Sequence, residues 1–256
     1  MRLTTALSST ISIALLCSSL VAGGKQASPD QTPEPSPNPP QTYGILLFRA
    51  FELLDVFGPL EALSLLATRT NLTLYLLSET LSPVSTQPLL PAMNPFNSTF
   101  FPTINPTHTL DTAPLLDVLI VPGGLGTRSP YLNLTLEYIK TVYPSLDFLL
   151  TICTGSALVA KTGLLDGRRA TTNKAAWNGS IANAPNVHWV PRARWVVDGN
   201  IWTSSGVSAG IDATLAFIKE YYGREEASEI ADLMEYVWHE DPDWDPFADV
   251  WDVPGA

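Results

Sequence analysis

Short apolar runs alternate with helical segments along most of this chain, and that alternation constrains the fold more than any other feature. The apolar runs occupy residues 43–48, 72–77, 117–121 and 146–152, and helices are expected at 55–67, 131–142 and 154–161. Strands that are apolar on both faces are typical of a sheet buried between two layers. A strand–helix–strand order makes neighbouring strands parallel. The sequence therefore predicts an α/β fold, a three-layer sandwich with a mostly parallel central sheet.

Two other stretches fit the same plan. Residues 82–114 are rich in Pro, Asn and Thr and are expected to form loops and hairpins, with short strands around residues 84–90. In the second half, Asp198 and Gly199 predict a hairpin turn between strands at 194–197 and 200–203. Helical periodicity then returns and predicts a helix that ends near Gly223.

Three groups with chemical potential follow predicted strands. Asp55 comes after the first strand, Gly123 and Gly124 come after the third, and Cys153 comes after the fourth. Functional sites in parallel α/β sheets lie beyond the carboxyl ends of the strands. We therefore expect these groups to converge. Each also has a structural interpretation: Asp55 could be a helix N-cap, and the glycine pair could be an ordinary turn.

Cys153 stands on the predicted strand-to-helix turn, the position that a nucleophile elbow occupies in α/β hydrolases. Such a turn points the side chain out of the sheet, and the adjacent helix N-terminus favours thiolate over thiol. The alternative is that a lone cysteine is a small buried hydrophobe. The small residues that follow it, from Thr154 to Ala157, favour a reactive site.

The N-terminus predicts passage through a secretory pathway. Residues 1–23 combine Arg2, an apolar stretch and small residues that suit cleavage, so we expect a signal peptide that removes Cys17. Residues 24–41 are Pro-rich and predict a disordered linker, so the folded domain should span residues 42–238. N-glycosylation triplets agree with a secreted protein and begin at Asn71, Asn97, Asn133 and Asn178.

The chain is acidic, with a formal net charge of −11, and this argues against nucleic acid or an anionic membrane as partner. The excess negative charge concentrates in residues 239–256, where acidic residues alternate with Trp244, Phe247 and Trp251. We expect an acidic aromatic tail whose rings pack back onto the domain. A lid over a pocket is the alternative.

Several motifs together resemble the ThiJ/PfpI superfamily. They are LDVFGP at 54–59, IVPGG at 120–124, ICTG at 152–155, GLLDGRRATTN at 163–173 and WTSSGVSAGID at 202–212. The resemblance covers residues 43–238 and implies the flavodoxin-like fold of class I glutamine amidotransferases. The Cys-Thr-Gly elbow and the aspartate of the first motif are similar to the isonitrile hydratase-like branch.

The resemblance also implies roles for individual residues. Cys153 is similar to the family's nucleophile, and Asp55 to the acidic residue that hydrogen-bonds the cysteine sulfur. The backbone amides of Gly124 and Thr154 resemble the pair that binds an oxyanion. The chemistry asks for such groups independently, because a thiolate needs a proton partner and developing charge needs donors. Members of the superfamily commonly form homodimers, so a homodimer is expected.

One departure from the superfamily concerns histidine. Many relatives carry a histidine just after the Thr-Thr pair, where this chain has Asn173. We do not expect the three histidines, His108, His188 and His239, to reach the elbow, and His188 is expected to be a packed core residue. A Cys-His dyad is thus predicted to be absent, which disfavours peptidase, glyoxalase and deglycase activities.

The sequence thus predicts a cysteine-dependent, isonitrile hydratase-like lyase that acts on a small molecule. No cluster of His and Cys has metal-ligand spacing, and no phosphate-binding loop is present, so neither a metal nor another cofactor is expected. The alternative from another class is a non-catalytic binding or redox-responsive protein whose cysteine oxidises reversibly. A regulator of transcription is disfavoured, because no helix-turn-helix motif follows the domain.

Overall fold

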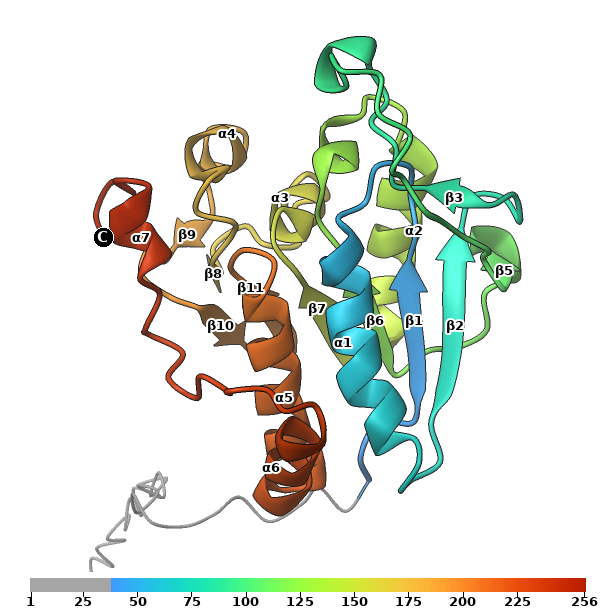
Figure 1. The fold of residues 1–256 in the computed structure, drawn as a ribbon, viewed down its shortest axis with the longest axis vertical. Helices are drawn as coiled ribbons and strands as arrows, with labels where there is room; N and C mark the ends of the chain where they lie inside the picture. The colour runs from blue at the N-terminus through green and yellow to red at the C-terminus, as the bar shows by residue number, and fades with distance from the viewer. Residues whose placement is uncertain (1–37) are drawn as a thin grey trace, which may run out of the picture. The chain divides into compact units, whose positions relative to one another are not determined.

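The architecture comes from a computed structural model that describes residues 38–256. The predicted signal peptide, and the predicted linker up to residue 37, lie outside the described residues. The central sheet has seven strands in the order β10-β11-β7-β6-β1-β2-β5, and every neighbouring pair is parallel except β10 and β11 (Figure 1). The predicted mostly parallel sheet is confirmed.

The strands of this sheet are short and mostly buried. Their bounds are β1 Thr42–Leu46, β2 Thr73–Ser78, β5 His108–Thr109, β6 Val118–Val121, β7 Phe148–Thr151, β10 Trp195–Asp198 and β11 Ile201–Ser204. All four residues of β6 are buried, as expected for a strand covered on both faces. Two small ladders pair β3 Val84–Ser85 with β4 Thr103–Ile104, and β8 Arg169–Ala170 with β9 His188–Trp189.

Helices cover both faces of the sheet (Figure 1). One layer holds α1 Leu53–Leu66, α5 Ala209–Tyr222 and α6 Arg224–Leu233, which contact one another. The other holds α2 Asn133–Val142 and α3 Gly155–Ala160, which also contact each other. Short helices complete the chain: α4 Trp177–Ile181, α7 Phe247–Val250 and the 3₁₀ turns Pro91–Met93, Leu110–Thr112, Leu125–Arg128 (η3) and Tyr143–Ser145. The predicted three-layer sandwich is confirmed.

The sheet brings the suspected site residues to one edge. Strands β1, β6 and β7 are neighbours, so the segments that follow them meet beyond their carboxyl ends. These segments carry Asp55, the glycine pair and Cys153. Among the described residues, no helix combines the length and apolarity needed to cross a membrane.

Candidate functional site

Cys153 occupies a strained turn between β7 and α3. Its φ of 57° lies in the left-handed region, which is uncommon for residues other than glycine. The turn is held on both sides: the Cys153 amide donates to the Ser205 carbonyl at 3.0 Å, and Ser156 and Thr172 donate to the Cys153 carbonyl at 3.1 and 3.2 Å. Strain of this kind, fixed by surrounding bonds, is typical of functional positions. The geometry of the predicted nucleophile elbow is therefore present.

Asp55 lies in the first turn of α1, but it does not cap the helix. The N-cap residue is Glu52, which makes no side-chain capping bond. The Asp55 side chain instead accepts a hydrogen bond from the Gly123 amide at 2.8 Å on Oδ2. Its other oxygen, Oδ1, is buried and has no hydrogen-bond partner among the described residues. The N-cap interpretation is wrong, and the site interpretation fits.

Burial dominates the electrostatics of Asp55. The residue is fully buried, and desolvation raises the pKa of its carboxyl to about 7. The Gly123 amide opposes this rise, the negative charge of Glu52 adds to it, and the Cys153 thiol opposes it. The thiol thus lies close enough to influence the carboxyl, although its alignment falls short of a full hydrogen bond to Oδ1. Near neutral pH, Asp55 can both accept and release a proton.

The glycine pair is needed because three segments meet there. A Cβ on Gly123 would lie 2.6 Å from the Thr154 amide nitrogen and 2.9 Å from Asp55 Oδ2. Gly124 has a φ of 117°, and a Cβ there would lie 2.4 Å from the Glu52 nitrogen. An ordinary turn would not require such close contacts. The glycines let the segment after β6 pack directly against both the Asp55 helix and the Cys153 elbow.

The two amides predicted to bind an oxyanion already have partners. The Gly124 amide donates to Thr154 Oγ1 at 3.0 Å, and the Thr154 amide interacts with the Cys153 sulfur and lowers the pKa of the thiol. Thr127 also donates to Thr154 Oγ1, at 3.3 Å. Both predicted residues are therefore at the site. Their role towards an oxyanion stays a prediction.

Asn173 replaces the missing histidine as the side-chain partner of the sulfur. Its Nδ2 donates to Cys153 Sγ at 3.2 Å, and its Oδ1 accepts from the Ala176 amide at 2.9 Å, which fixes the orientation of the side chain. The sequence marked this position only as a departure from the superfamily. The signal that could have identified it is its distance from the cysteine along the chain, which matches that of the family's histidine.

The Cys153 thiol is protonated near neutral pH, contrary to the thiolate that we expected. Only 4% of the residue is exposed. Burial raises the pKa of the thiol well above its usual range, the negative charge of Asp55 adds to the rise, and the Thr154 amide and Asn173 reduce it. Helix α3 has only six residues, and its dipole does not outweigh desolvation. The sulfur must therefore give up its proton during any reaction.

A cavity of about 190 Å³ lies beside this site. Its lining includes Asn173, Ser205 and Gly206, together with Phe247 and Trp251 of the C-terminal tail. Cys153 itself does not line the cavity, but Asn173, which donates to its sulfur, does. Ala248 and Val253 of the tail pack against Trp177, and Phe247 and Trp251 border the cavity.

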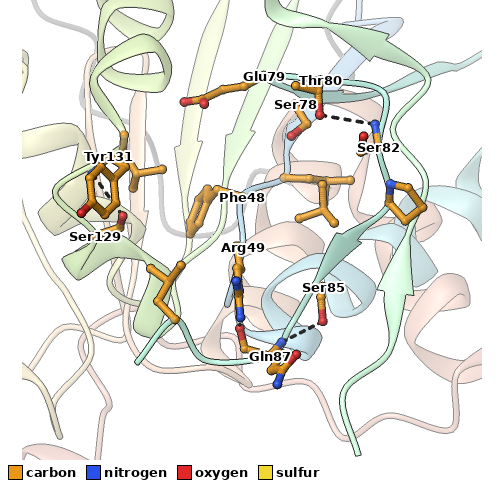
Figure 2. A pocket seen from close by; sticks show the side chains of 15 residues that line it. Phe48, Arg49, Ser78, Glu79, Thr80, Ser82, Ser85, Gln87, Ser129 and Tyr131 are labelled. Atoms are coloured by element: carbon orange, nitrogen blue, oxygen red, sulfur yellow. Dashed lines mark hydrogen bonds between the residues drawn. The ribbon is translucent and has the colours of Figure 1, made fainter. Parts of the chain in front are cut away.

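A larger cavity, of about 480 Å³, lies away from the thiol. Its lining includes Arg49, Glu79, Gln87 and Tyr131, and none of Cys153, Asp55 or Asn173 (Figure 2). In Figure 2 the Arg49 guanidinium lies beside Gln87, and it donates to the carbonyl oxygen of that residue at 3.3 Å. The strained cysteine and the buried carboxyl, and not the volume of a cavity, define the candidate site.

The histidines lie away from the elbow. His108 forms a hydrogen bond with Thr107, and His239 stacks on Trp244 with ring centroids 4.9 Å apart. His188 is exposed on β9, so its predicted place in the core is wrong. A two-residue strand at the edge of the domain leaves its side chain in solvent. Among the described residues, no group of His, Cys, Asp or Glu could hold a metal ion.

Comparison with known proteins agrees with this geometry. The sequence pattern of the DJ-1/PfpI family matches residues 44–220. The chain is 32% identical to isonitrile hydratase of Pseudomonas putida over 197 residues, which cover 76% of this chain and 78% of that protein. It is 30% identical to the HTH-type transcriptional regulator GbdR of Pseudomonas aeruginosa over 133 residues, 52% of this chain and 36% of the regulator. The crystal structure of a ThiJ/PfpI family protein from Pseudomonas syringae aligns with a TM-score of 0.64 and 25% identity, and covers 81% of this chain and 83% of that one.

The prediction of a secreted glycoprotein is wrong. Relatives include HTH-type transcriptional regulators, and nothing in the relatives supports a signal peptide, secretion or glycosylation. An acceptor triplet is short enough to occur by chance. Two of the asparagines lie in helices, Asn133 in α2 and Asn178 in α4, whereas glycosylation favours surface loops. We therefore withdraw the N-glycans predicted at Asn71, Asn97, Asn133 and Asn178.

Proposed function

Because the chain belongs to the DJ-1/PfpI family, we propose that it is a cysteine-dependent, isonitrile hydratase-like lyase. It adds water to a small isonitrile and releases an N-substituted formamide. One observation carries the proposal: a nearly buried thiol faces a fully buried carboxyl with a pKa of about 7 and one oxygen without a partner. Perturbed groups of this kind at a strand edge are typical of catalytic pairs. The similarity to isonitrile hydratase supplies the substrate class.

In the first step, Asp55 removes the thiol proton while the sulfur attacks the terminal carbon of the isonitrile. The new S–C bond leaves an electron pair on that carbon, and Asp55 returns the proton to it, which gives a thioimidate. A carboxyl with a pKa near 7 suits both transfers. The Asn173 amide and the Thr154 amide, both directed at the sulfur, stabilise its negative charge during the attack.

In the second step, water resolves the thioimidate. Asp55 takes a proton from the water molecule while the water oxygen bonds to the thioimidate carbon. Asp55 then passes that proton to the nitrogen. The S–C bond then breaks, the hydroxyl proton returns to the sulfur, and the formamide leaves. As the hydroxyl proton leaves, negative charge grows on the added oxygen, and the Gly124 amide would donate a hydrogen bond to it in place of Thr154 Oγ1.

The buried position of the sulfur suits an isonitrile. Cys153 is 4% exposed and its sulfur is in contact with the Asn173 amide, so a reactive group must be slender to reach it. The isonitrile group is linear and ends in a single carbon atom. An ester or a peptide carbonyl carries substituents on both sides of the reacting carbon and fits this approach less well. This favours the lyase over a peptidase.

The redox-responsive alternative has weaker support. Oxidation of cysteine depends on thiolate character and on exposure. Burial raises the pKa of the Cys153 thiol and shields it from solvent, so both factors are low. Relatives in the family commonly act as homodimers on small molecules, and we propose the same assembly and substrate class for this chain.

The test is formamide production from cyclohexyl isonitrile by the purified protein, followed by chromatography. We expect turnover in the wild type and none above background in Cys153→Ala, with a melting temperature close to that of the wild type as the control for folding. We also expect kcat/KM to rise with pH through about 7, as Asp55 ionises to its proton-accepting form. Undiminished turnover in Cys153→Ala would refute the proposal.

A further inference from the structure

The C-terminal segment supplies part of the cavity beside the thiol, although it lies beyond the region matched by the family. That match ends at residue 220, and the segment comprises residues 239–256. Its Phe247 and Trp251 line the same cavity as Asn173, whose side-chain amide donates to Cys153 Sγ. A substrate that approaches the sulfur past Asn173 therefore passes two aromatic rings.

The segment is fixed to the domain and does not hang free in solvent. Lys174 Nζ lies 3.4 Å from Asp245 Oδ2, and both side chains are buried. The Arg194 amide donates to the Pro242 carbonyl at 2.6 Å. Ala248 and Val253 are buried against Trp177. Such anchors give Phe247 and Trp251 defined positions, whereas Phe247 is still 46% exposed and Trp251 55% exposed, so the rings remain open to a ligand.

The charges around the cavity favour a neutral ligand. Two cationic residues line it, Lys174 and Arg194, and each is already paired with a buried carboxylate, Asp245 and Asp212 respectively. Lys174 also donates to Thr171 Oγ1 and to the Ala193 carbonyl, both at 2.8 Å. An anion would therefore find no uncompensated positive charge on either residue. The apolar side chains of the lining are the two aromatic rings, Val207 and Ala175.

We propose that Phe247 and Trp251 determine specificity by holding the apolar substituent of a neutral substrate. This inference rests on the proposed function and deepens it: the isonitrile is one with an aromatic or branched alkyl group. The substituent packs on the two rings while the slender isonitrile carbon passes Asn173 to the sulfur. Apolar area removed from water supplies the binding energy, and the rings add their own contacts.

The experiment compares cyclohexyl isonitrile with methyl isonitrile. The ratio of their kcat/KM values should fall about tenfold in Phe247→Ala and in Trp251→Ala, the scale of one lost apolar pocket contact. Phe247→Leu and Trp251→Phe should restore part of the ratio. The matched control is Trp244→Ala, an equally exposed ring of the same segment that stacks on His239 and does not line the cavity. It should leave the ratio unchanged. Equal ratios in all variants, or an equal fall in Trp244→Ala, would overturn the proposal.

A second measurement separates this inference from the proposed function. Cys153 is alkylated with iodoacetamide or with its N-benzyl derivative. Because the chain has a second cysteine, Cys17, the product at Cys153 is measured in its own peptide by mass spectrometry. The benzyl-to-unsubstituted rate ratio should fall in Phe247→Ala and Trp251→Ala but not in Trp244→Ala. If the wild type hydrates no isonitrile while this ratio falls as expected, the proposed function is wrong, but the role of Phe247 and Trp251 in binding an apolar substituent is supported. If isonitriles are hydrated and neither ratio changes, Phe247 and Trp251 do not determine specificity, and the proposed function remains supported.

Discussion

Two fully buried aspartates in this molecule have opposite surroundings. Asp212, at the start of α5, accepts from Arg194 Nε at 2.6 Å and from the His239 amide at 3.0 Å, so both of its oxygens have partners and its charge has a counterion. Asp55, at the start of α1, accepts one amide on Oδ2, has no partner on Oδ1, and has no cation beside it. The two carboxylates are equally buried, but only the charge of Asp212 is balanced by a counterion and by hydrogen bonds to both oxygens.

The difference separates a structural carboxylate, Asp212, from Asp55, which we propose to be catalytic. A charge in a protein interior costs several kcal/mol unless a counterion and hydrogen bonds offset that cost. Around Asp212 the protein supplies both, and the pair joins α5 to the segment before β10 and to the start of the tail. Around Asp55 it supplies only one amide, and the pKa of the carboxyl rises to about 7. The site thus retains an energetic cost that makes proton transfer easy at neutral pH.

The largest expected effect on stability comes from removing Asp212, the counterion of Arg194. Asp212→Ala leaves the Arg194 guanidinium, whose side chain is 4% exposed, without its counterion. Loss of one partner of a buried pair costs about 3–5 kcal/mol, which corresponds to a fall of roughly 10 °C in melting temperature. Thermal unfolding followed by circular dichroism measures it. A melting temperature close to that of the wild type would mean that the Asp212 pair is not a principal structural contact.

Asp55→Asn should raise the stability of the protein at alkaline pH, whereas Asp212→Ala should lower it. A carboxyl whose folded pKa is raised adds stability below its unfolded pKa, and that stability is lost as pH rises through the folded pKa of about 7. The wild type should therefore lose at most about 4 kcal/mol of its free energy of unfolding between pH 4 and pH 8 through this group. The asparagine cannot ionise, so the variant should melt a few °C above the wild type at pH 8, and the two should converge near pH 4.

The same variant should lose activity while it gains stability. Without a proton acceptor beside the thiol, turnover should fall by about 10²-fold or more. Stability gained together with activity lost is the signature of a functional site, whereas Asp212→Ala should lose stability first. If Asp55→Asn instead destabilises the protein at every pH, the carboxyl contributes to structure as Asp212 does, and the contrast between the two aspartates disappears.

The sequence predicted the architecture and the members of the site better than their chemical state. Apolar runs located the core strands, and their carboxyl ends located Asp55, Gly124 and Cys153. Burial and pairing depend on contacts between distant segments, so the protonated thiol and the orphan oxygen of Asp55 could not be read from the chain. The same holds for the bond from Asn173 to the sulfur, and for the aromatic rings with which the tail lines the cavity. The secretory interpretation failed because short local signals were given the weight of structural ones.

The smallest expected effect concerns Asn173, the side-chain hydrogen-bond partner of the Cys153 sulfur. Asn173→Asp is nearly isosteric, and it keeps an oxygen to accept from the Ala176 amide at 2.9 Å while it replaces the Nδ2 donor that lies 3.2 Å from Cys153 Sγ. The sulfur loses a hydrogen bond and gains a neighbouring negative charge, so the pKa of the thiol should rise further and kcat/KM should fall about tenfold. Asn173→Gln, which retains the amide on a longer side chain, tests reach separately from charge. If Asn173→Asp is as active as the wild type, the Thr154 amide alone stabilises the sulfur. The Asn173 hydrogen bond would then contribute little to the reaction, and Asp55 would be the single charged side chain on which the site depends.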